Sequence, residues 1–251
     1  MPTYLYCVLA PTSLEALPSG LRGIGGAPVR SLPFGASGEL EAWVSSIGDA
    51  VLRATGSEVA TQALMHNEVV NAALRTGRTP APTRYGSYFS DDTACIADLD
   101  RRSAVLATIL GRIADAVEMA VLLVPTSGAM ANEAISPPAS NEPTAGRRYL
   151  ESIRQRVHES QRRRAAAEAE AGRLGCTVGR YIRGEARSIA ATGMMSLAHL
   201  VRNADLTPYR NALAGFVPGG AFRLVIGGPR APYSFSDSGL DRSGHDSGNH
   251  T

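Results

Sequence analysis

The order of apolar runs and one long helical segment in the second half of the chain constrains the fold most strongly. The run "VEMAVLLV" (residues 117–124) is apolar almost throughout, which is typical of a strand in the centre of a sheet. A long polar segment with helical character, residues 144–174, follows it. The later predicted elements are two short strands, a helix that begins near Thr207 and Pro208, and a last strand, at residues 186–191, 194–201, 206–216 and 221–228. The strand–helix–strand–strand–helix–strand order predicts a ferredoxin-like (βαββαβ) sandwich.

The long helical segment has a narrow apolar stripe made of Leu150, Ile153 and Val157. Between Arg147 and Arg164 it carries seven arginines against two glutamates, and farther on it is rich in alanine and glutamate. Such a helix is too polar to be buried on all sides. It either covers one face of the sheet or projects and pairs with another helix, in a partly coiled-coil-like manner. The arginines form a solvated face or contact an acidic partner, and both interpretations stay open.

The first half of the chain predicts a smaller mixture of strands and helices. Residues 3–9 form a strand, and two strand-like runs follow the glycine-rich loop "GLRGIGGAPVR". No helix follows this loop directly, so it is not predicted to hold a phosphate. The remaining predicted elements are a helix from Ser57 to Gly77, a strand at residues 83–89, and a helical region from residue 91 that breaks near Asp100. The apolar face of the first helix is predicted at Val59, Ala63, Val70 and Leu74.

These elements predict an α+β protein of two domains. Residues 1–115 form an N-terminal α+β domain, and residues 116–236 form the ferredoxin-like domain with its long helix. Residues 125–143 contain four prolines and are predicted to be a linker within the second domain. Residues 237–251 have no apolar periodicity and are predicted to be a disordered tail.

Composition and motifs point away from several classes of function. A formal charge of +2 does not favour a nucleic-acid binder with a strongly basic face. No apolar run is long enough to cross a membrane, and the start of the chain is not typical of a signal peptide. The three cysteines, Cys7, Cys95 and Cys176, are far apart, which indicates reduced thiols in a cytoplasmic protein and no zinc site.

No catalytic constellation is visible in the sequence. His66 and Glu68 form an H-x-E pair, but the second histidine of a zinc-protease helix is missing. We therefore expect His66 to be packed or solvated and not to bind zinc. His158 and His199 lie in other predicted elements, and no G-x-S-x-G motif occurs. We therefore predict no enzyme activity, no cofactor and no metal. A small-molecule-binding regulator or a cofactor-independent enzyme remains the alternative, because ferredoxin-like folds also host those functions.

Four motifs occur in an order that resembles the F/L family of gas vesicle proteins (GvpF/GvpL). They are "YLYCVLAP", the region of residues 24–45, "HNEVV" with "PTRYGSYF", and "GPRAPYSF". Arg230 and Ala231 stand where the family usually has Trp-Pro, which bears on how tightly the C-terminal segment docks. The sequence does not distinguish the F from the L paralogue.

The resemblance implies a gas vesicle accessory or minor structural protein. It would bind the small hydrophobic shell protein and prevent its aggregation during vesicle nucleation and assembly. It would also bind other gas vesicle accessory proteins. The implied place is the cytoplasm, in association with gas vesicles, with no nucleic-acid or membrane partner. An assembly partner could cover a strand edge and an apolar patch of the shell protein.

Two groups of residues are candidates for these roles. Partner contacts are assigned to Arg84, Tyr85, Tyr88 and Phe89, because arginine and tyrosine are common interface anchors. A structural latch is assigned to Pro229, Pro232, Tyr233 and Phe235. The prolines would end the last strand, and the two aromatic rings would pack across the interface between the two domains.

Overall fold

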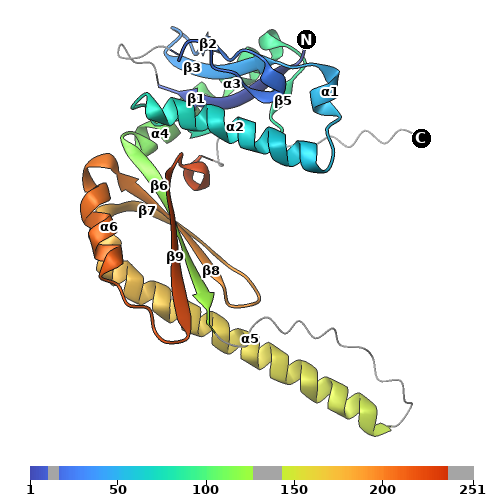
Figure 1. Ribbon diagram of the computed structural model, residues 1–251, viewed down its shortest axis with the longest axis vertical. Coiled ribbons are helices and arrows are strands. Elements are labelled where there is room, and N and C mark those ends of the chain that lie inside the picture. The colour runs from blue at the N-terminus through green and yellow to red at the C-terminus, as the bar shows by residue number, and fades with distance from the viewer. Residues whose placement is uncertain (11–16, 127–142, 237–251) are drawn as a thin grey trace. The chain divides into compact units, whose positions relative to one another are not determined.

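The computed structural model describes residues 1–10, 17–126 and 143–236, and its described part forms two compact units. Unit 1 contains Met1–Glu118 and the described residues after Gly228, and unit 2 contains Met119–Gly228. Figure 1 shows the elements of each unit. The predicted linker, apart from its ends, and the predicted tail lie outside the described residues.

The division into units differs from the predicted domains at both ends. Residues 116–118 and 229–236 belong to unit 1, although the sequence predicts them in the second domain. The reason is that residues near position 231 pack into the core of unit 1, although they are far from it in the sequence. Ala231 is fully buried in the core of unit 1, and Tyr233 packs against the same core.

Unit 1 contains a five-stranded sheet in the order β2-β3-β1-β4, and β5 pairs with β1. The strands are β1 (Thr3–Leu9), β2 (Arg30–Phe34), β3 (Leu40–Ser46), β4 (Ala81–Pro82) and β5 (Tyr88–Phe89). β1 pairs antiparallel with β3, β4 and β5, and all of its residues are buried. An irregularity in the β1–β3 register falls between Leu5 and Cys7. The predicted first strand is confirmed.

Four α-helices accompany this sheet among the described residues of unit 1. They are α1 (Asp49–Leu52), α2 (Ser57–Arg75), α3 (Asp92–Arg101) and α4 (Ser103–Ile113). The predicted break near Asp100 is confirmed, and Asp91 caps α3 by accepting a hydrogen bond from the Ala94 N–H at 2.8 Å. Val69, Val70 and Ala73 of α2 pack with Tyr4, Tyr6 and Trp43 of the sheet, among others, to form the core.

Two details of the predicted unit 1 elements are wrong. Residues 83–89 do not form one strand, because Gly86 has a φ of +93° and turns the chain between β4 and β5. The buried face of α2 is centred on His66, Val69, Val70 and Ala73, whereas Val59 at its start is 36% exposed. The predicted face missed His66 because a histidine does not count as apolar in a periodicity pattern.

Unit 2 contains a four-stranded sheet in the order β7-β8-β6-β9. The strands are β6 (Ala116–Pro125), β7 (Ile182–Ile189), β8 (Met195–Arg202) and β9 (Phe222–Arg230), and their terminal residues 116–118 and 229–230 belong to unit 1. β6 lies between β8 and β9, which confirms the predicted central strand. β7 and β8 pair antiparallel with Ala186 opposite Ala198.

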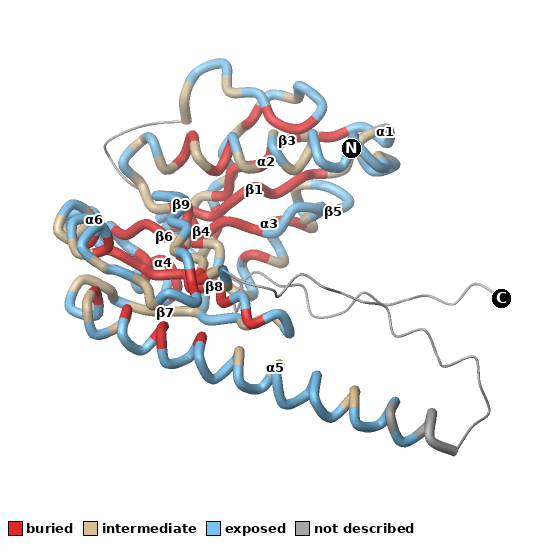
Figure 2. Tube along the Cα trace, turned by 60° about the horizontal axis from the view of Figure 1, so that its bottom comes forward, coloured by how far each residue is buried: buried red, intermediate tan, exposed pale blue. Residues whose placement is uncertain are grey.

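The two α-helices described in unit 2 are α5 (Pro143–Val178) and α6 (Leu206–Ala214). They pack on one face of the sheet, where Met119, Val121 and Leu123 of β6 contact a shared core. The residues of α5 in that core are Ala167, Ala171, Leu174 and Val178, all in its C-terminal half (Figure 2). The element order β6-α5-β7-β8-α6-β9 agrees with the predicted order. The chain is thus a mixed α+β protein with antiparallel strand pairs.

Candidate functional site

A buried histidine links the main sequence motifs of unit 1. His66, on α2, lies within hydrogen-bonding distance of the Thr83 carbonyl (Nε2···O 3.0 Å) and the Tyr4 hydroxyl (Nδ1···O 3.0 Å). A carbonyl oxygen only accepts, so Nε2 carries the proton and Nδ1 accepts from Tyr4. Burial disfavours the charged ring and lowers the pKa of His66 to about 4, and the ring is therefore neutral at pH 7.

The Tyr4 hydroxyl extends this network to the turn after β4. Its oxygen accepts the Gly86 N–H at 3.0 Å, and the Thr83 hydroxyl donates to the Leu5 carbonyl at 2.7 Å. These bonds fix the backbone of residues 83–86 against β1 and α2. The exposed side chains of this turn therefore have a rigid, buried support.

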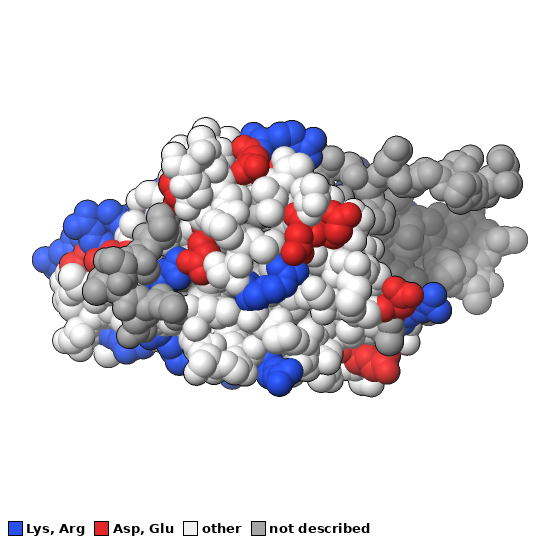
Figure 3. Space-filling model, turned by 90° about the horizontal axis from the view of Figure 1, so that it is seen from above, with Lys and Arg blue, Asp and Glu red and all other residues white. Residues whose placement is uncertain are grey.

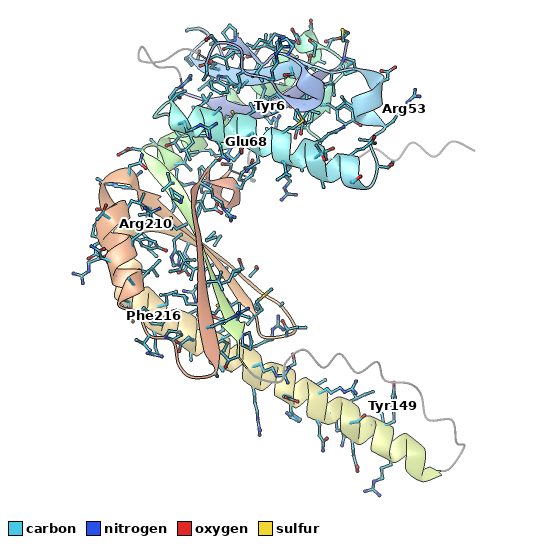
Figure 4. The ribbon with its side chains drawn as sticks, viewed as in Figure 1. Tyr6, Arg53, Glu68, Tyr149, Arg210 and Phe216 are labelled. Atoms are coloured by element: carbon cyan, nitrogen blue, oxygen red, sulfur yellow. The ribbon has the colours of Figure 1, made fainter. Side chains whose placement is uncertain are left out.

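The glycine-rich loop is attached to the same cluster through Tyr6, which Figure 4 labels in unit 1. The Tyr6 hydroxyl accepts the Ile24 N–H at 2.8 Å. A Cβ atom on Gly23 would lie 2.0 Å from this hydroxyl oxygen, so glycine is required there by close approach. The loop thus has a structural role in unit 1.

Replacing Gly23 with alanine is expected to destabilise unit 1 by about 2–3 kcal/mol, because either the Tyr6 ring or the loop must move. The matched control is Gly111→Ala in α4, where a Cβ meets no atom within 4 Å. That change should stabilise by about 0.5–1 kcal/mol, since alanine favours helix more than glycine does. Urea unfolding of both variants measures the difference, and equal effects would contradict the proposed contact.

The C-terminal motif also belongs to this cluster. The Tyr233 ring lies 6.4 Å from the His66 ring, and its hydroxyl is 3.4 Å from Asn67 Oδ1. Arg112 donates to the Phe235 carbonyl, and Phe235 itself is buried. Of the four predicted latch residues, Tyr233 and Phe235 thus pack within unit 1. Pro229 lies inside β9, which continues to Arg230, so it does not end that strand; β9 is at the edge of its sheet, where proline is tolerated.

An apolar groove lies beside this network, between α1, the start of α2 and the turn at Gly86. One hollow of about 210 Å³ is lined by residues that include Tyr4, Leu52, Val59, Tyr85 and Tyr88. A second hollow of about 380 Å³ shares Val51 and Gln62 with the first and extends along α2 to Met65. We call the two together the α1–α2 groove.

The four predicted contact residues differ in their exposure: three lie on the surface and one is buried. Tyr85 and Tyr88 line the groove and are 36% and 43% exposed. Tyr85 donates to Gln62 Oε1 at 2.8 Å, and Arg84 is exposed on the same turn. Phe89, by contrast, is buried in β5, so its ring does not lie on the surface.

The sequence did not indicate that Leu52 and Val59 would line a surface hollow, and it predicted Val59 on the apolar face of its helix instead. Leu52 and Val59 are 39% and 36% exposed, and they come from the segment around "AVLRATGSEV". The only signal for them was an apolar pair flanking a short glycine-containing loop. That signal is weak because the same pattern occurs at the start of many buried helices.

The two other described histidines, His199 and His158, belong to unit 2. His199, in unit 2, is fully buried between the Tyr209 hydroxyl (2.7 Å) and Glu185 Oε2 (3.1 Å). His158 is exposed on α5. Within the described ranges, no group of three or more His, Cys, Asp or Glu side chains is placed to hold a metal ion.

A family model for the gas vesicle synthesis proteins GvpL/GvpF matches residues 2–237, nearly the whole chain. The chain belongs to the GvpL/GvpF family. Gas vesicle protein L of Streptomyces sp. (strain CB03234) is similar to this member, with 29% identity over 93% of this chain and 92% of that protein.

Two crystal structures share the fold of this GvpL/GvpF member. GvpF from Anabaena sp. PCC7120 superposes with a TM-score of 0.67 at 16% identity, over 99% of both chains. GvpF from Microcystis aeruginosa superposes with a TM-score of 0.64 at 15% identity, over 94% of this chain and 98% of that one. These structures show the fold, and the family model over residues 2–237 confirms the predicted family and a role in gas vesicles.

The face shown in Figure 3 carries scattered charges of both signs on a largely uncharged surface. None of the described helices is long and apolar enough to span a membrane.

Proposed function

We propose that the α1–α2 groove binds the small hydrophobic shell protein of the gas vesicle and keeps it from aggregating during nucleation and assembly. The observation that carries this proposal is the set of exposed apolar side chains along the groove, Leu52, Val59, Tyr85 and Tyr88. Rigid aromatic and aliphatic side chains around a hollow are typical anchors for an apolar partner. The hydrogen bonds of His66 and Tyr4 fix the turn that carries Tyr85.

Binding by strand addition is less well supported than binding in the groove. The described sheet of unit 1 has β2 and β4 at the two ends of its main strand order. β2 contains Pro33, and β4 has only two residues and ends at Pro82. Proline cannot donate to a ladder, so neither strand is a good template for an added strand.

We also propose that the protein acts without catalysing a reaction. The smaller hollow is lined by apolar and tyrosine side chains, a glutamine and a glycine, and the larger hollow contributes one carboxylate, Glu58, with no histidine or cysteine among its lining residues.

We further propose that unit 2 is a ferredoxin-like domain. The strand order β9-β6-β8-β7, taken with the order of strands and helices along the chain, supports this assignment.

An aggregation assay tests the proposed function. Shell protein diluted from denaturant should stay soluble in the presence of the full chain, and the Leu52→Ser/Val59→Ser variant should lose most of that protection. The control is Val105→Ser, because Val105 is also an exposed apolar residue of unit 1, at 52%, but lies on α4 and does not line the groove. Equal protection by all three proteins would refute the groove as the binding surface, and no protection by the unmodified chain would refute the proposed function.

A further inference from the structure

We infer that the N-terminal part of α5 is a docking arm for an acidic amphipathic helix of another protein. The arm is defined as the part of α5 before Ser160, and its exposed side chains include Tyr149 (Figure 4). The Ser160 hydroxyl donates to the Ala191 carbonyl at 3.1 Å, where α5 passes the turn between β7 and β8. No described side chain of the arm is buried, whereas the later part of α5 packs on the sheet.

The apolar stripe of the arm continues the stripe that the sheet covers. Ala167, Ala171, Leu174 and Val178 follow the a and d positions of a heptad repeat, and all four are buried. The same a and d positions in the arm are Leu150, Ile153 and Val157. Leu150 is 60% and Val157 50% exposed, and Ile153 between them is partly buried, so this part of the stripe is covered much less than the part against the sheet. Ser160 and Arg164 interrupt the repeat between the covered and uncovered parts.

Charge decides what kind of helix fits this stripe. Within the arm, the e and g positions beside the stripe hold Arg147, Arg154 and Arg156, together with Tyr149. Glu151 and Glu159 occupy b and c positions, away from the seam, although they pair with Arg147 and Arg163 along the helix. Arg154 and Arg156 are exposed and make no ion pair with a described residue.

These positions select an acidic occupant and disfavour a second copy of the chain. Residues at e and g determine partner choice in a coiled coil, because they face the partner helix across the seam. A second copy of the arm would bring the same arginines to the seam and offers no acidic e or g residue to pair with them. A partner helix with apolar a and d residues and glutamates at e and g satisfies both the stripe and the charge. This inference does not depend on the α1–α2 groove.

Designed peptides test the inference on the full chain. The probe is a helical peptide of three heptads (about 21 residues) with isoleucine at a, leucine at d and glutamate at e and g. The control peptide carries lysine at e and g. Fluorescence anisotropy should show that the chain binds the glutamate peptide at least about tenfold more tightly than the lysine peptide.

Variants of α5 make the test specific. Arg154→Glu/Arg156→Glu should abolish the preference for the glutamate peptide, because Arg147 remains beside two acidic residues. Arg162→Glu should not, because Arg162 is at an f position, away from the seam. Leu150→Ser/Val157→Ser should weaken binding about tenfold or more.

Several results would overturn the inference. These are no binding of the glutamate peptide, equal binding of both peptides, and no effect of the double charge reversal. A stable dimer in sedimentation would show that a second copy occupies the arm. Binding to lipid vesicles that contain phosphatidylserine, without binding to the glutamate peptide, would show that the arm binds an anionic lipid surface instead.

Discussion

Replacing Arg230 with alanine is expected to lower the free energy of unfolding of unit 1 by about 2–3 kcal/mol. The carboxylate of Glu118 is fully buried and accepts two hydrogen bonds from Arg230, at 2.9 and 2.5 Å, and one from the Ser234 N–H at 2.8 Å. Without the guanidinium, a buried negative charge keeps a single donor. The Arg230 side chain is 47% exposed, so water reaches part of the site and the loss falls at the low end for a buried pair.

Two further variants show whether the buried charge causes this loss. The double variant Arg230→Ala/Glu118→Gln removes the charge but keeps an oxygen for the Ser234 N–H, so it should recover to within about 1 kcal/mol of the unmodified chain. Arg53→Ala, an exposed arginine of unit 1 (Figure 4), should change stability by less than about 0.5 kcal/mol. Trp43, the one tryptophan of the chain, is buried in unit 1 and reports its unfolding in urea. A double variant as unstable as the single one would show that the charge is not the cause.

The stability of unit 1 is expected to fall by about 3 kcal/mol between pH 6.5 and pH 4 through His66 alone. The folded-state pKa of His66 is lowered to about 4 by burial, while an unfolded histidine has its ordinary value of about 6.5. The unfolded chain therefore binds the extra proton in this range. The contribution of His66 is fully present above pH 6.5 and is lost as the pH falls toward 4.

The variant His66→Gln isolates this effect from the carboxylates that titrate in the same range. Glutamine can donate to the Thr83 carbonyl and accept from Tyr4, but it takes up no proton. The difference in unfolding free energy between the unmodified chain and His66→Gln should shrink by about 3 kcal/mol from pH 7 to pH 4. Parallel pH profiles of the two proteins would mean that His66 is protonated in the folded state or is not buried in solution.

The sequence predicted most helices and strands correctly where the pattern was local. The strand at residues 3–9, the helix break near Asp100 and the element order of the second half all follow from apolar periodicity and turn residues. The strand predicted at residues 83–89 failed because Gly86 adopts a positive φ. A glycine in the middle of an alternating pattern is compatible with both a strand and a turn, so the pattern could not decide.

The candidate site was predicted only in part. Aromatic and arginine composition selected the turn with Tyr85 and Tyr88 correctly as surface, but it could not show that Phe89 points inward. Leu52 and Val59 belong to different helices and acquire a shared surface only when α1 and α2 pack beside that turn.

The sequence by itself determined the family, the order of the elements and the long amphipathic helix, because these depend on the spacing of residues along the chain. Only the tertiary structure decided that His66 is a neutral, buried link between four motifs, and that Arg230 neutralises a buried Glu118. The reason is distance along the chain: Arg230 and Glu118 are 112 residues apart, and Tyr4 and His66 are 62 apart. Contacts of that range are set by how the elements pack, and no local pattern of residues encodes them.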